Sequence, residues 1–151
     1  MNPIRILKDH PDAVIPTYAT QGAAGFDLHA VIDDPDGAVL QPGRRLMVST
    51  GLRLAIPEGW EMQIRPRSGL AARHGVTVLN SPGTIDADYR GVVQIILVHH
   101  GDADLPIRTG DRIAQGVIAK VWTAPFLEVQ DPCDLGETLR GSGGFGSTGT
   151  N

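Results

Sequence analysis

The chain has 151 residues, with 13 Lys and Arg against 17 Asp and Glu, so its formal net charge is −4. This length favours a single main domain that buries roughly 70% of the surface of its unfolded chain. The negative charge argues against nucleic acid as the main partner. No run approaches the roughly 18 apolar residues of a membrane span, and the N-terminus has no apolar signal core, so we expect a cytoplasmic protein without membrane contact.

The composition also limits the core. Apolar residues make up 41% of the chain but aromatic residues only 5%, so the core has to consist of Val, Ile, Leu and Ala. The 19 Gly and 11 Pro favour short strands and tight turns over long helices. The single cysteine, Cys133, excludes an internal disulfide and a cysteine-based zinc site.

Short apolar runs separated by turn signals predict an all-β sandwich or barrel. The runs lie at 4–7, 46–48, 52–56, 62–64, 76–79, 92–98 and 113–121.

The first polar residue of interest is Asp27, a single carboxylate within the apolar strand sequence 23–28. If it is buried, it needs a charged or metal-linked partner. The alternative is an exposed strand end, where the carboxylate faces water.

Two arginines, Arg65 and Arg67, stand directly before a predicted helix of one or two turns at 68–75. Ser68 is the expected N-cap and Gly75 the expected end of this helix. A helix N-terminus attracts anions through its free amides and its dipole, so this segment predicts an anion site; the alternative is a basic surface loop. Ser68 does not fit a serine hydrolase, because Pro66 stands where the nucleophile elbow has glycine.

The stretch 83–91 concentrates Asp86, Asp88, Tyr89 and Arg90 between two glycines. Apolar runs at 76–79 and 92–98 on either side predict that it forms the turn of a buried β-hairpin. Ionised groups beside a core are costly unless paired or used, and such loops on a rigid scaffold often carry chemistry. The alternative is a solvated acidic turn.

The strand 92–98 is apolar on both faces except at Gln94. Both faces therefore need cover, which a subunit interface would provide. Gln94 needs a hydrogen-bond partner, either core backbone or a ligand. The next residues, His99 and His100, lack the companions of a zinc site.

The tail 140–151 is rich in glycine and cannot fold by itself. It is either a disordered terminus or an arm that orders over a ligand, with an aromatic ring to stack and polar groups to grip an anion. We therefore divide the chain into a β domain at 1–139 and a flexible arm at 140–151. The near-match of the arm to a P-loop fails because Ser147 stands at the lysine position and no helix can follow.

Together these features indicate a nucleoside triphosphate bound with a divalent metal. The chain also closely resembles the trimeric deoxyuridine triphosphatases (dUTPases), whose five ordered motifs it carries in family order. These are Ala24-Gly25-Phe26-Asp27-Leu28, Pro66-Arg67-Ser68-Gly69-Leu70, Gly83-Thr84-Ile85-Asp86-Ala87-Asp88-Tyr89-Arg90-Gly91, Arg112-Ile113-Ala114-Gln115 and Arg140-Gly141-Ser142-Gly143-Gly144-Phe145-Gly146-Ser147-Thr148-Gly149.

The resemblance implies a jelly-roll-like, distorted β-barrel with one short helix and a flexible C-terminal arm that closes over the active site. It implies a homotrimer with active sites at the subunit interfaces. The reaction it implies is hydrolysis of dUTP to dUMP and pyrophosphate with Mg²⁺, which lowers dUTP and supplies dUMP for thymidylate synthesis.

The resemblance also assigns roles to residues. Asp86 would be the general base for in-line attack of water on the α-phosphorus, and Tyr89 would pack under the deoxyribose and exclude a 2′-hydroxyl. A hairpin at 75–83, with Asn80, would read uracil through its backbone. Mg²⁺ would be held mainly by the phosphates, with Asp27 contributing through water. The implied substrate-binding residues are Arg67, Ser68, Gly69, Asn80, Thr84, Ile85, Asp86, Tyr89, Gln94, Gln115, Arg140, Phe145, Ser147 and Thr148.

Two alternatives remain open at this point. One is a dCTP deaminase of the same fold family, which carries a different pocket built around a glutamate. The other is a catalytically silent nucleotide-binding module, against which the intact Asp86 argues. The arm and the 83–91 pattern favour dUTP hydrolysis.

Overall fold

The computed structural model describes residues 2–144. It contains ten strands, one α-helix and one 3₁₀ turn within this range. In chain order the elements are β1 (Arg5–Lys8), β2 (Gly25–His29), β3 (Ala38–Leu40), β4 (Arg45–Ala55), β5 (Trp60–Arg65), α1 (Ser68–His74), β6 (Val76–Val78), β7 (Gly83–Ile85), β8 (Val92–His99), β9 (Leu105–Ile107), β10 (Arg112–Lys120) and η1 (Pro132–Leu135).

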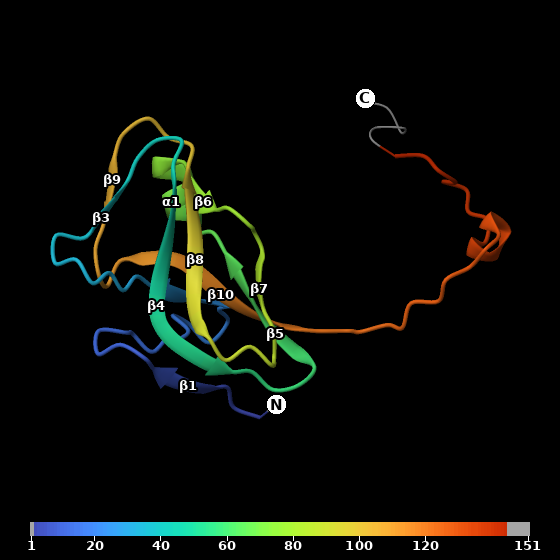
Figure 1. Cartoon of the computed structure of the whole chain (residues 1–151), viewed down its shortest axis with the longest axis horizontal. Helices are drawn as coiled ribbons and strands as arrows, with labels where there is room; N and C mark the ends of the chain where they lie inside the picture. Colours follow the sequence, from blue (N-terminus) through green and yellow to red (C-terminus); the bar gives the residue numbers. More distant parts are fainter. Residues whose placement is uncertain (1, 145–151) are drawn as a thin grey trace.

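The strands form two four-stranded antiparallel sheets and a small two-stranded one (Figure 1). One large sheet has the order β1-β4-β8-β6, the other β2-β10-β5-β7, and β3 pairs with β9. Neighbours in space are far apart in sequence, as in a jelly roll, which confirms the predicted all-β, jelly-roll-like class. Within residues 2–144 the large sheets keep separate edges, so the expected barrel is not closed.

The core lies between the two large sheets and is aliphatic, as the composition predicts. On β8 the inward residues Val93, Ile95 and Leu97 are fully buried, and they meet Leu28 and Met62 from the other sheet. Each such side chain contributes about 1.5–3 kcal/mol through burial. This packing makes the sandwich a rigid base for the loops at its ends.

The strand β8 does not have two fully covered faces. Its outward residues are Gln94, which is exposed, and Ile96 and Val98, which are half-buried. Of the two partners considered for Gln94, the core backbone does not fit, because the side chain is exposed on the outer face of the sheet.

The helix α1 occupies the predicted place but begins differently. Its N-cap residue is Arg67, without a side-chain capping bond, so the expectation that Ser68 caps the helix is wrong by one position. Gly75 ends the helix in the left-handed conformation, with φ 65°, as expected. The backbone at Gly75 then lies against residues 100–101, where the amide of His100 donates to the carbonyl of Gly75 at 2.9 Å. This contact holds the short helix against the sheet.

The connection between β6 and β8 is more complex than a hairpin turn. β6 pairs with the end of β8, as predicted, but the intervening segment crosses to the other sheet, where β7 pairs with β5. The expected hairpin at 75–83 is therefore wrong, since β6 and β7 belong to different sheets. Residues 79–82 instead bridge the two sheets.

After β10 the chain leaves the sandwich and runs away from it through η1 (Figure 1). Its large apolar side chains are exposed, Trp122 to 93%. The others are Phe126, Leu127, Leu135 and Leu139. Phe145, Ser147 and Thr148 lie outside the described residues. No helix within 2–144 is long and apolar enough to cross a membrane.

Candidate active site

The loop after β7 is fixed mainly through its own backbone. The amide of Tyr89 donates to the carbonyl of Asp86 at 3.2 Å, which closes a turn. The Arg90 guanidinium donates to the carbonyls of Ala87 and Tyr89 at 2.6 and 2.8 Å. Arg90 therefore shapes the loop.

The Asp86 carboxylate is exposed at the end of β7. No side-chain hydrogen bond or ion pair engages it within the described part of the chain. It lines a pocket of about 280 Å³ together with Glu58, Trp60 and Glu61. A carboxylate held on a fixed turn and open to solvent can accept a proton from a bound water.

Tyr89 lies flat over the end of the same loop. Its hydroxyl donates to the carbonyl of Val92 at 3.1 Å, and the side chain is 43% exposed. The ring packs directly on Gly91, where any Cβ would overlap the phenol. Glycine at this position therefore lets the ring lie down, and the exposed face of the ring is available to a ligand.

A second polar cluster joins β2, β10 and the segment before α1. The Nε of Arg67 contacts the Oδ1 of Asp27 at 2.8 Å, and the Nη1 of Arg112 contacts Oδ2 at 3.3 Å. The Nη1 of Arg67 also donates to the carbonyl of Arg112 at 3.1 Å. Asp27 thus has the charged partners that partial burial demands, and the two arginines leave a net positive charge beside Ser68.

The predicted phosphate residues gather around this cluster. Ser68 and Gly69 open α1, and Gln115 faces outward from β10 opposite both Asp27 and Arg65. The Gln115 amide donates to the carbonyl of Pro66 at 2.9 Å, which fixes the approach to the helix. Arg67, Ser68, Gly69 and Gln115 are therefore brought together on one side of the molecule.

His29, on the same strand as Asp27, was not predicted from the sequence. Its Nδ1 is buried and has no hydrogen-bond partner in residues 2–144. Burial lowers the pKa of His29, Arg112 and Arg67 lower it further, and Asp27 acts in the opposite direction. The Asp27-Leu28-His29 sequence, with both polar side chains on one face of the strand, would have been the signal to notice.

The two clusters lie at opposite ends of β5. Ile85 pairs with Met62, so Asp86 continues toward Glu61, whereas Arg67 follows the far end of the strand. Arg67 lies six positions after Glu61, which is about 20 Å of extended chain. One chain by itself does not bring Asp86 and Arg67 together.

The remaining predicted residues are spread out. Asn80 is exposed beside Gly83, Thr84 is exposed and Ile85 half-buried on β7. Gln94 lines a groove with Met47 and Ser49 that none of the other predicted residues shares. The Nε of Arg140 donates to the carbonyl of Gly143 at 2.8 Å within the extended segment.

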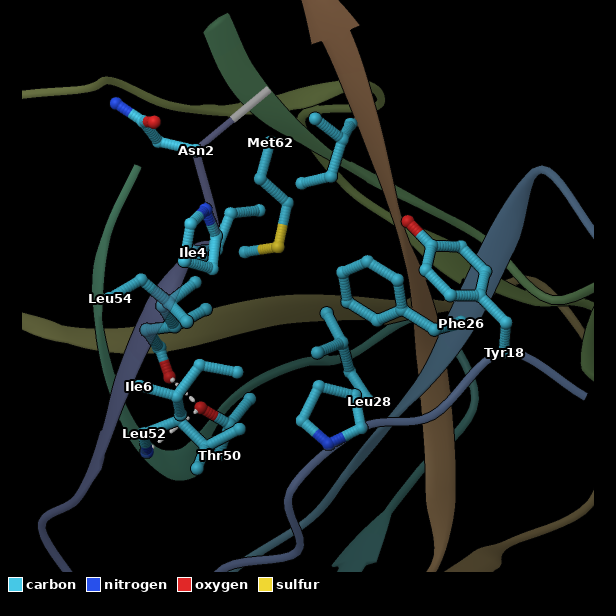
Figure 2. A pocket seen from close by; sticks show the side chains of 14 residues that line it. Asn2, Ile4, Ile6, Tyr18, Phe26, Leu28, Thr50, Leu52, Leu54 and Met62 are labelled. Carbon is cyan, nitrogen blue, oxygen red and sulfur yellow. Dashed lines mark hydrogen bonds between the residues drawn. The ribbon is translucent and has the colours of Figure 1, made fainter. Parts of the chain in front are cut away.

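A larger apolar pocket of about 400 Å³ opens elsewhere, between the sheets and the N-terminal segment. Figure 2 shows Ile4, Met62 and Phe26 pointing into it, with Tyr18 packed edge-on against Phe26. None of the predicted site residues lines it. Its lining is that of an unfilled core rather than of a polar active site.

The described residues contain no group of three His, Cys, Asp or Glu side chains that could hold a metal ion. Both oxygens of Asp27 are engaged by arginines. A metal at this site would therefore have to take its ligands mainly from a bound anion, which is the way Mg²⁺ commonly binds with triphosphates.

The fold and the two clusters define a jelly-roll-like β protein with Arg67 and Arg112 around Asp27 on one side and a separate loop carrying the exposed carboxylate of Asp86. The dUTPase family model matches residues 11–149, so the chain belongs to the dUTPase family.

Curated relatives agree with this assignment. The deoxyuridine 5′-triphosphate nucleotidohydrolase of Caulobacter vibrioides is 58% identical over 138 residues, covering 91% of this chain and 87% of the relative. That of Wolinella succinogenes is 56% identical over 146 residues, covering 97% and 93%. These names do not favour the dCTP deaminase alternative.

Solved structures agree on the fold. The dUTPase of Staphylococcus bacteriophage 80alpha, solved with dUPNHPP, has a TM-score of 0.86 at 24% identity and covers 99% of both chains. A mutant dUTPase from phage phi11 of S. aureus, described with a structural Mg(II) ion, has a TM-score of 0.76 at 22% identity, covering 86% of this chain and 98% of that one.

Proposed function

We propose that this chain hydrolyses dUTP to dUMP and pyrophosphate in active sites shared between the subunits of a homotrimer. Membership of the dUTPase family over residues 11–149 carries the reaction. The separation of Asp86 from Arg67 along β5 supports the shared site, because two chains can meet where one chain cannot.

In this proposal Asp86 acts as the general base. Its carboxylate takes a proton from a water that attacks the α-phosphorus in line. The bond from the α-phosphorus to the bridging oxygen breaks, and pyrophosphate leaves. The exposed position of Asp86 on a fixed turn supports this role. A positioned general base typically raises the reaction rate about 10²- to 10⁴-fold.

Arg67, Ser68, Gly69 and Gln115 would bind the triphosphate. Arg67 is held by Asp27 and by the carbonyl of Arg112, so its guanidinium is already oriented before an anion arrives. Such preorganised donors stabilise developing charge without reorganising at the moment of reaction.

We propose Mg²⁺ as the metal, bound through the phosphates, with Asp27 in contact through water only. When bound, Mg²⁺ would neutralise charge on the triphosphate. The engagement of both Asp27 oxygens by Arg67 and Arg112 favours this indirect contact over direct ligation.

The base and sugar would be read by the segment from Asn80 to Tyr89, including Thr84 and Ile85. Tyr89 lies over Gly91 with one face free, which suits packing under a deoxyribose. A tight bridge at 79–82 would reject the thymine methyl, a discrimination of about 1–3 kcal/mol. Of the proposed substrate-binding residues, Gln94 has the least structural support, because it faces a groove that the others do not line.

The arm would complete the site, with Phe145 stacking on uracil and Arg140, Ser147 and Thr148 closing on the γ-phosphate. Closure of a lid excludes water and commits the substrate. The division into a β domain at 1–139 and an arm at 140–151 is part of this proposal.

Association of subunits has separate support. Five large apolar side chains in 122–139 are exposed along a segment that leaves the sandwich, and the pocket of Figure 2 is apolar. Exposed apolar surface of this kind marks interaction sites. We also propose that the enzyme works in the cytoplasm, where its single free cysteine, Cys133, suits a reducing compartment.

The test is pyrophosphate and ammonia release from dUTP, dTTP, dCTP and UTP. We expect pyrophosphate from dUTP in strong preference and no ammonia from dCTP. Asp86→Asn should keep nucleotide binding while kcat falls at least about 100-fold. Ammonia from dCTP would favour a deaminase, and an unchanged kcat in Asp86→Asn would remove Asp86 as the base.

A further inference from the structure

Arg53 lies outside the five sequence motifs, yet it contacts the loop that carries Asp86. It stands on β4 just past the irregularity where the register with β8 shifts, and it pairs opposite Val92. Its Nη1 donates to the carbonyl of Arg90 at 3.1 Å. Of the side chains outside the loop in residues 2–144, Arg53 alone hydrogen bonds to 86–90.

The other edge of the same guanidinium is held by Asp9. Nε contacts Oδ1 at 2.7 Å and Nη2 contacts Oδ2 at 3.3 Å, a two-point ion pair that fixes the plane of the group. Asp9 is itself anchored, because its amide donates to the carbonyl of Gly51 at 2.8 Å. The hydrogen bond from Arg53 lowers the pKa of the Asp9 carboxyl, so the pair stays charged at neutral pH.

This contact differs from the others in the loop. Arg90 bonds to the carbonyls of Ala87 and Tyr89, but it moves with the loop because it belongs to it. Arg53 stands on a long central strand that packs on both sides. It therefore ties the loop to the sandwich next to Tyr89, whose hydroxyl bonds to the carbonyl of Val92.

We propose that Arg53, oriented by Asp9, is a positioning residue that fixes the loop carrying Asp86 and Tyr89 and thereby sets the preference for dUTP over UTP. The proposal rests on the proposed function for its kinetic consequences. Its structural consequence, a loop held in place before any nucleotide binds, does not depend on the reaction.

The first experiment measures amide hydrogen exchange in a peptide spanning 86–92, in full-length protein without nucleotide. Arg53→Gln should raise exchange there by about tenfold, and Asp9→Ala should do the same because it releases Arg53. The matched control is Arg45→Gln, on the same strand and exposed, with no side-chain hydrogen bond in the described part of the chain. Exchange that is equal in Arg53→Gln and Arg45→Gln would overturn the proposal.

The second experiment compares kcat/KM for dUTP and for UTP. In Arg53→Gln, kcat/KM for dUTP should fall about tenfold to a hundredfold, because displacement of a reacting group by about 1 Å has effects of this size. The ratio of kcat/KM for dUTP to kcat/KM for UTP should fall as well. Arg53→Lys should be intermediate, since it can reach only one of the two partners. The Asp9→Ala, Arg53→Gln double variant should be no worse than Arg53→Gln alone.

Two kinetic outcomes would overturn the proposal. One is a dUTP-to-UTP ratio within twofold of the wild type. The other is an equal loss on both substrates together with a lower melting temperature, which would make Arg53 merely structural. If the wild-type protein released no pyrophosphate from dUTP, the proposed function would fall, and the exchange comparison would still support or overturn the positioning role.

Discussion

At the scale of single residues, the contact between Tyr89 and Gly91 bears on the proposed role of Tyr89 in substrate choice. Tyr89 can lie flat with an exposed face only because Gly91 has no side chain beneath it. A tyrosine in this position has a defined face to offer a sugar ring. If Tyr89 packs under the sugar as proposed, Gly91 is as necessary to the site as the phenol above it.

Gly91→Ala should displace the Tyr89 ring and weaken the discrimination against a 2′-hydroxyl. We expect kcat/KM for dUTP to fall about tenfold and the dUTP-to-UTP ratio to fall with it. The matched control is Gly22→Ala, where an added Cβ meets nothing within 4 Å. An unchanged ratio in Gly91→Ala would show that Tyr89 does not read the sugar.

His29 predicts a dependence of stability on pH. Its pKa is lowered in the folded state from the usual 6.5, mainly by burial, so the unfolded chain takes up a proton more readily. Its contribution to stability is then complete above about pH 6.5 and is lost as the pH falls through the lowered pKa. Urea midpoints measured from about pH 8 to pH 5 should fall on the acid side, and His29→Gln should flatten this slope. The control variant is His100→Gln, because His100 is exposed.

Whether the role of a residue could be predicted from the sequence depended on how far along the chain its partners lie. Asp27 could be interpreted from its own strand, because a carboxylate among apolar residues has to find a charged partner. Arg53 could not, since Leu52-Arg53-Leu54 is an ordinary alternating strand and its partners Asp9 and Arg90 lie 44 and 37 residues away. Nothing local in a sequence records such contacts.

At the scale of elements, periodicity predicted the strands but not which sheet each one joins. β6 and β7 follow each other closely and were expected to form a hairpin, yet they pair with β8 and β5 respectively. The predicted helix is present and ends at Gly75 as expected. Its N-cap residue, however, is Arg67 without a side-chain capping bond, so tertiary contacts rather than a serine cap support its first turn. Pairing partners and short helix ends are decided by packing, which local propensity does not contain.

Deletion of 140–151 tests the arm as an element. Residues 140–144 hydrogen bond only among themselves and to Thr138, so their loss should leave the melting temperature nearly unchanged. Turnover of dUTP should collapse, because the γ-phosphate and the base would lose the contacts that we propose for the arm. Arg140→Ala in the full-length chain should give an intermediate loss. A truncated protein that unfolds would instead make the arm a structural element.

At the scale of the whole molecule, the separation of the two clusters supports the proposed site shared between chains. The residues proposed to bind phosphate and the loop with Asp86 lie at opposite ends of β5, about 20 Å apart along the extended chain. The segment 122–139 runs away from the sandwich, and its large apolar side chains are exposed. Both observations are accounted for when chains associate, and light scattering should then show a trimer at working concentration.

The measurement that tests the shared site most directly is complementation between two inactive variants. Asp86→Asn and Arg67→Ala should each be nearly inactive alone, since every site lacks one partner. The two variants are unfolded together in equal amounts and refolded as mixed trimers. They should recover about a quarter of wild-type activity, because a site is intact when one chain supplies Asp86 and its neighbour supplies Arg67, and each condition is met about half the time. A mixture that stays as inactive as its components would contradict a site built from two chains.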